Sequence, residues 1–88
     1  MNRKMFLKVA DQADIQLDFE PSIAIKPNTI KCLKVNNTFM VYAIDAHLNK
    51  QLIIETNNEG RVYKAILKHL DIKLNHHGDV IKTPTKAR

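Results

Sequence analysis

The chain has 88 residues, 44% of them apolar, and a formal net charge of +5. A chain of this length holds one modest hydrophobic core, so we predict one small domain over residues 1–82 and a flexible basic tail over 83–88. Cys32 is the only cysteine, which excludes a disulfide-stapled secreted scaffold. No run approaches the ~18 apolar residues of a membrane span, and we expect a cytoplasmic protein without a membrane partner.

The first twenty residues support two interpretations. Apolar side chains recur at helical spacing over residues 4–12, whereas Ile15, Leu17 and Phe19 alternate with polar residues as in a strand. We therefore predict a short helix or an extended segment over 4–12. A strand is predicted to follow over 14–19.

Two prolines, Pro21 and Pro27, bracket the next segment. Because proline cannot donate to a hydrogen-bond ladder, we predict an edge strand or an extended connection between them. Residues 29–35 are rich in β-branched side chains, which favours a strand over a two-turn helix. Asn36 and Asn37 then indicate a tight turn, since asparagine tolerates positive φ.

The stretch from 38 to 56 is predicted to be the centre of the fold. Two runs dense in β-branched and aromatic residues, 39–45 and 51–56, flank a short polar break, which is typical of a β-hairpin. The first run is apolar on both of its faces, so both faces are expected to need covering: Phe39, Val41 and Ala43 on one, Met40, Tyr42 and Ile44 on the other. With 29–35, these strands form an antiparallel meander.

A helix is predicted over residues 60–69. Its apolar residues recur at helical spacing: Val62, Tyr63, Ile66, Leu67 and Leu70. The alternative is a fourth strand over 61–66, which would produce an SH3-like barrel. The fold class is therefore α+β or mostly β: a small twisted antiparallel sheet or an SH3-like small barrel, with one short helix near 60–69.

The segment after this helix predicts a second hairpin. Residues 70–74 alternate between apolar and polar side chains, as a strand does. The turn signal at 75–78 contains Gly78, which is available for positive φ. Residues 79–82 are expected to return as the partner strand.

No catalytic constellation is recognisable in the sequence. Gly60 and Gly78 are the only glycines, too few for a glycine-rich phosphate-binding loop. Cys32 has no base at a defining spacing, and no serine nucleophile motif is present. We expect a protein that is not an enzyme and that uses no cofactor.

The histidines raise the question of a metal site. His76 and His77 share one turn with Asp79, and His69 precedes them by one predicted strand. Adjacent histidines on a strand-like backbone point in opposite directions, however, which argues against a shared metal ion. We predict no metal site and interpret these residues as exposed turn histidines.

The basic residues point to a partner. Arg61, Lys64 and Lys68 are spaced i, i+3 and i+7, which predicts one stripe along the helix, and Lys31 and Lys34 precede the central hairpin. Lysine and arginine contacts to phosphates supply the sequence-independent affinity for nucleic acid. We predict these five residues as nucleic-acid contacts. The alternative is that they form an ordinary solvated face.

Two functional hypotheses follow. The first is a small non-enzymatic basic protein that contacts DNA or RNA as a regulatory or accessory factor. The phosphate backbone is favoured over the bases, because Phe39 and Tyr42 lie on opposite faces of their strand and cannot stack bases together. The second is a protein interaction module, such as a small inhibitor or adaptor encoded by a phage or other mobile element, that binds an acidic protein. The sequence leaves the oligomeric state open, with a dimer as one alternative.

Overall fold

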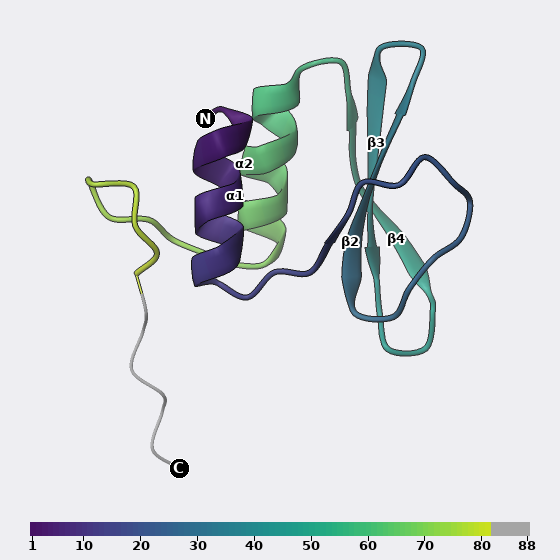
Figure 1. The fold of residues 1–88 in the computed structure, drawn as a ribbon, viewed down its shortest axis with the longest axis horizontal. Coiled ribbons are helices and arrows are strands. Elements are labelled where there is room, and N and C mark those ends of the chain that lie inside the picture. Colours follow the sequence, from purple (N-terminus) through teal and green to yellow (C-terminus); the bar gives the residue numbers. More distant parts are fainter. Residues whose placement is uncertain (82–88) are drawn as a thin grey trace.

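A computed structural model describes residues 1–81, in which two helices pack against one face of a four-stranded sheet (Figure 1). The strands lie in the order β1-β2-β3-β4; β1 pairs in parallel with β2, and the other neighbours are antiparallel. In chain order the elements are α1 (Arg3–Gln12), β1 (Leu17–Asp18), β2 (Thr29–Val35), β3 (Thr38–Ile44), β4 (Lys50–Thr56) and α2 (Glu59–His69).

The fold is therefore a small α+β fold with an open, mixed sheet. An SH3-like barrel is not confirmed, because the sheet does not close, and the parallel strand β1 corrects the expectation of a wholly antiparallel sheet. Two helices are present, whereas the predicted fold class named one short helix near 60–69. The predicted tail, 83–88, lies outside the described residues.

The predicted meander of β2, β3 and β4 is confirmed. Asn36 and Asn37 both adopt positive φ, at 49° and 65°, which suits the tight turn that joins β2 to β3. At the next turn, the Asp45 carboxylate accepts hydrogen bonds from the backbone N–H groups of His47 and Asn49, at 2.8 Å and 2.9 Å. Each turn thus uses side chains that stabilise a local reversal.

The first segment is helical, which settles the choice left open over residues 4–12. The side chain of Asn2 caps α1 by accepting the N–H of Met5 at 2.8 Å. The strand predicted over 14–19 shortens to Leu17–Asp18, because Asp14 turns at φ 56° and the N–H of Ile15 bonds back to the helix end. Asp14 and Ile15, which the alternating pattern assigned to a strand, therefore end the helix instead.

The segment between the prolines is a connection without strand pairing. It runs from β1 to β2 on the side of the sheet away from the helices (Figure 1). Below, the outer face means this side of the sheet. The connection covers only part of it, because Met40 and Tyr42 of β3 stay partly exposed while Val41 is fully buried.

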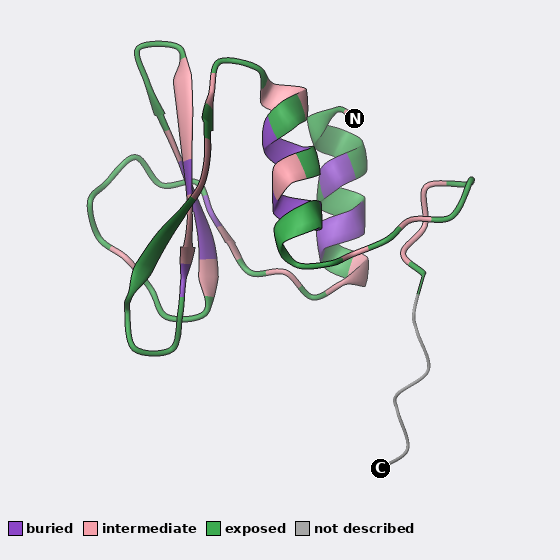
Figure 2. Ribbon diagram, turned by 180° about the vertical axis from the view of Figure 1, so that it is seen from behind, coloured by how far each residue is buried: buried purple, intermediate pink, exposed green. Residues whose placement is uncertain are grey.

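The core lies between the two helices and the sheet. The rings of Phe6 in α1 and Tyr63 in α2 stack with centroids 4.5 Å apart, and both side chains are buried. Val41 meets them from the sheet, and the buried parts of the helices and central strands face one another in Figure 2. Most of the stability is expected to come from this apolar contact.

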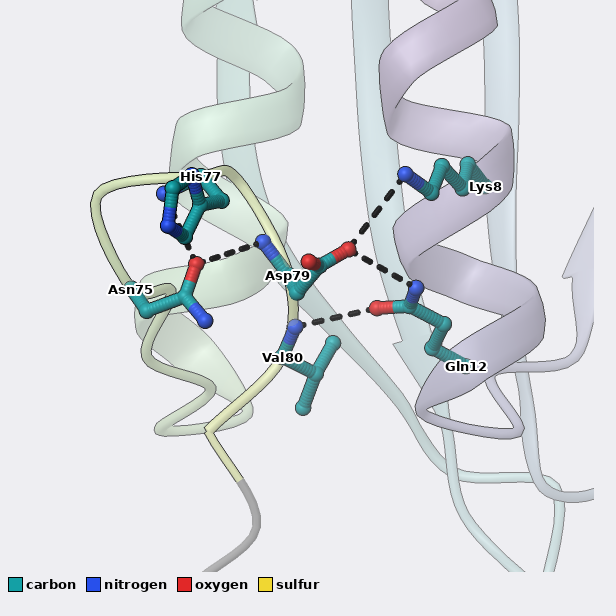
Figure 3. A network of polar contacts seen from close by, with 6 residues as sticks. All are labelled: Lys8, Gln12, Asn75, His77, Asp79 and Val80. Atoms are coloured by element: carbon teal, nitrogen blue, oxygen red, sulfur yellow. Dashed lines mark hydrogen bonds and ion pairs between the residues drawn. The ribbon is translucent and has the colours of Figure 1, made fainter.

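Within the described residues, the hairpin predicted after α2 is short and forms one bridge, Leu74 with Val80; residue 82 of its predicted second strand lies outside that range. This segment also docks on α1 through polar contacts (Figure 3). Gln12 donates to Asp79 at 3.2 Å and accepts the N–H of Val80 at 2.9 Å, and Lys8 lies 3.3 Å from the same carboxylate. Two backbone hydrogen bonds also cross the turn, from the Asn75 N–H to the Asp79 carbonyl at 2.9 Å and from the Ile81 N–H to the Lys73 carbonyl at 2.8 Å. The short hairpin is therefore held both by its own backbone and by the first helix.

Candidate nucleic-acid interface

Helix α2 carries most of the predicted contacts. Asn58 caps it by accepting the N–H of Arg61 at 3.2 Å. Glu59 lies in its first turn, and Lys68 and His69 lie in its last, an order that complements the helix dipole. The helix predicted over 60–69 is confirmed, and the alternative strand over 61–66 is wrong.

The basic stripe, defined as Arg61, Lys64 and Lys68, faces away from the core. All three side chains are exposed, whereas the opposite side of the helix is buried: Val62, Tyr63, Ile66 and Leu67. Seven residues of helix place the ends of the stripe about 10 Å apart along the axis. The ion pairs found within residues 1–81 join other groups, so the stripe has no carboxylate partner there.

Lys34 is exposed at the end of β2 and does not continue the basic stripe. Its Nζ atom lies 5.4 Å from the centre of the Phe39 ring, its neighbour on β3. Lys34 lies two positions after Cys32 on β2, and Phe39 lies two positions before Val41 on β3. Since Cys32 and Val41 face the core, both side chains point to the helix side of the sheet. Lys34 therefore belongs to a separate site at this end of the sheet.

Lys31 requires a correction, because it is not at the surface. Its side chain is 2% exposed, and its Nζ lies 3.2 Å from Asp18 Oδ2 and 3.2 Å from the carbonyl oxygen of Glu20. Strand alternation points Lys31 to the outer face, where the connection after β1 covers it. A buried, paired ammonium group cannot contact a phosphate, so the proposed set becomes Lys34, Arg61, Lys64 and Lys68.

The aromatic residues predicted from the sequence lie as expected, with Tyr63 on the buried side of α2. Tyr63 is buried, and its hydroxyl accepts from Arg3 Nε at 3.4 Å and donates to Glu59. The residue that sequence reasoning missed is Phe19, which is 39% exposed and has the Arg3 guanidinium 5.2 Å above its ring. The signal for it in the sequence was its place as the last apolar residue of the strand predicted over 14–19.

Phe19 and Phe39 border a common cavity of about 230 Å³, called here the aromatic pocket. Its remaining lining includes the apolar Cys32 and Val62 and the polar groups of Arg3, Lys34, Glu59 and Tyr63. A second cavity, of about 440 Å³, lies by the C-terminal ends of both helices. Its lining includes the acidic residue Asp14 but no basic residue. Of these two cavities among the described residues, the aromatic pocket is the one with the positive charge that an anionic ligand needs.

The histidines lie apart from both features. The ring centroids of His76 and His77 are 3.9 Å apart, in the turn held by Asn75. The expectation that the two side chains point in opposite directions is therefore wrong, because the turn does not have a strand-like backbone. Asp79, the carboxylate nearest to them in sequence, is engaged by Gln12 and Lys8. Within residues 1–81, no three potential ligands come together as a metal ion requires.

Among the residues that the structure describes, no helix combines the length and apolarity needed to cross a membrane. No family model, curated protein or solved structure matches this chain.

Proposed function

We propose that this protein is a small, non-enzymatic binding protein that contacts the phosphate backbone of nucleic acid through helix α2. The observation that supports the proposal is the basic stripe. Arg61, Lys64 and Lys68 share one exposed face of a helix whose other face is anchored in the core. Because no carboxylate within residues 1–81 holds them, these cations can meet phosphates without first breaking an ion pair.

Salt dependence gives this proposal a quantitative form. Each duplex phosphate that is neutralised contributes about −0.9 to the slope of log K against log salt concentration. Three contacts from the stripe therefore predict a slope of about −2.7 for duplex DNA. Such binding would be weakly sequence-dependent, as expected of a regulatory or accessory factor that follows the backbone.

The experiment is a titration of labelled duplex DNA, single-stranded DNA and RNA between about 50 and 200 mM salt. Changing Lys64 and Lys68 together to glutamine should make the slope for duplex DNA shallower by about 1.8, because two phosphate contacts are lost. It should also weaken binding to all sequences alike. Both side chains are exposed, so the fold should remain intact.

The matched control changes Lys26 and Lys50 to glutamine. These exposed residues lie away from α2, in the connection after β1 and at the start of β4, and the change removes the same charge. The control should keep the wild-type slope. The proposal would be rejected if both double variants lost affinity and slope equally, or if the wild type did not bind at about 50 mM salt.

The alternative, an interaction module for an acidic protein, has a different observation in its favour. Large apolar side chains remain exposed at or near the outer face: Ile23 is 97% exposed, Val35 53% and Leu52 49%. Uncovered apolar surface of this kind is typical of protein interfaces. A protein partner that is retained after nuclease treatment, with no binding to DNA or RNA, would favour this function.

A further inference from the structure

The aromatic pocket brings together two phenylalanines that are twenty positions apart in the sequence. Phe19 follows β1, and Phe39 lies near the start of β3. A cation lies over each ring: Arg3 at 5.2 Å from the centre of Phe19, and Lys34 at 5.4 Å from the centre of Phe39. The pocket thus combines aromatic walls with positive charge at its rim.

The size of the pocket limits what it can hold. Sites for whole cofactors usually measure about 300–1,000 Å³. At about 230 Å³, the aromatic pocket has room for a single planar group. Apolar lining from Cys32 and Val62 suits the face of such a group more than a fully hydrated ion.

The charges of the pocket favour an anion attached to that planar group. Among the described residues, Glu59 is the one carboxylate that lines it, and it is already engaged by Arg3, at 3.4 Å, and by the hydroxyl of Tyr63. Arg3 and Lys34 together outweigh this single negative charge. A planar ring joined to a phosphate is the chemistry of a nucleotide, whose base stacks on aromatic rings or on a guanidinium plane.

We infer that the aromatic pocket binds one unpaired nucleobase of a single-stranded nucleic acid, with Arg3 and Lys34 contacting its phosphate. This inference rests on the proposed function and extends it from the backbone to a base. The two sites share one element: Glu59 and Val62 line the pocket, and Arg61 of the basic stripe lies in the same turn of α2. A base inserted here would favour single strands over duplex, because a duplex keeps its bases stacked.

The first test uses adenosine 5′-monophosphate alone, followed by NMR amide shifts of the full chain. Millimolar nucleotide should shift the amides of Phe19, Lys34 and Phe39, and the shifts should be lost in Phe19→Leu, which keeps apolar bulk and removes the ring. Unchanged amides around the pocket, or the same shifts in Phe19→Leu, would overturn the inference.

The second test compares variants in binding to a single-stranded oligonucleotide. Phe19→Ala should weaken this binding about 5- to 100-fold and leave duplex binding unchanged. The matched control is Tyr42→Ala on the outer face, where Lys50 lies 5.4 Å from the ring centre but no part of the aromatic pocket is present. Equal effects of the two changes would overturn the inference.

The outcomes separate this inference from the proposed function. If Lys64→Gln with Lys68→Gln lowers the salt slope but Phe19→Ala changes nothing, the pocket is rejected and backbone binding stands. If no DNA or RNA binds, yet the mononucleotide shifts the pocket amides and Phe19→Leu abolishes the shifts, backbone binding is rejected and the pocket stands as a nucleotide site.

Discussion

Lys31 Nζ lies 3.2 Å from Asp18 Oδ2, and both side chains are buried on the outer face of the sheet. The two residues are register partners in the parallel pair of β1 and β2. The same ammonium group also donates to the carbonyl oxygen of Glu20, and the N–H of Glu20 donates to Asp18 at 3.0 Å. This ion pair therefore ties the short strand and the connection after it to the sheet.

Breaking this ion pair from one side should be costly. Asp18→Ala leaves the Lys31 ammonium group buried without a counter-charge, and we expect the free energy of unfolding to fall by about 3–5 kcal/mol. Asp18→Leu combined with Lys31→Met should recover most of that loss, because no buried charge remains. Urea denaturation measures both variants. A loss below about 1 kcal/mol for Asp18→Ala would contradict the buried pair.

Stability should fall in acid through specific carboxyl groups. Hydrogen bonding by the Glu20 N–H, aided by Lys31, lowers the pKa of Asp18, and the Asn49 N–H and side chain lower the pKa of Asp45. A lowered folded-state pKa means that the unfolded chain takes up protons first as the pH falls. The stabilisation is complete well above the ordinary aspartate pKa of about 3.9 and is lost below it.

We therefore expect the melting temperature to be nearly constant from about pH 6 to 5 and to drop below about pH 4. Asp45→Asn should make the drop shallower, because one of the responsible carboxyl groups is gone. Circular dichroism melts at several pH values measure this. An Asp45→Asn curve parallel to the wild type would exclude Asp45 as a contributor.

Cys32 should be unreactive in the folded protein. Burial raises the pKa of its thiol to about 11, and the residue is 7% exposed. At pH 8, the thiolate fraction is then roughly 100-fold or more below that of an unfolded chain, whose cysteine pKa is about 8.5. Labelling with a thiol-reactive disulfide reagent, with and without urea, measures the ratio. Comparable rates in the two conditions would show that Cys32 is accessible.

The contact between Gln12 and the segment that follows α2 should control local opening. Gln12→Ala removes hydrogen bonds to Asp79 and Val80, so the Val80 amide should exchange with solvent faster. Lys8→Ala is the matched control, because it removes only an exposed ion pair to Asp79 and leaves the Val80 N–H bonded. Hydrogen exchange followed by NMR measures both variants. Equal acceleration would show that Gln12 is not the main anchor.

Local patterns in the sequence were sufficient for the meander and for α2. Three signals carried these predictions: β-branched residues over 29–35, paired asparagines at a turn, and apolar residues at helical spacing over 60–69. All of them act between near neighbours in the chain. The exposure of Arg61, Lys64 and Lys68 followed from the same periodicity, because residues opposite a buried helix face must meet solvent. For these residues, local sequence and final structure agree.

Only the tertiary structure decided which other side chains are available to a ligand. Lys31 and Lys34 lie three positions apart, yet one is buried against Asp18 and the other lies at the rim of the aromatic pocket. Strand alternation places the two side chains on opposite faces of the sheet. The path of the connection after β1 then decides that Lys31 is covered, and the same path brings Phe19 to Phe39. Contacts between distant segments are selected by the packing of the whole chain, so no local spacing records them.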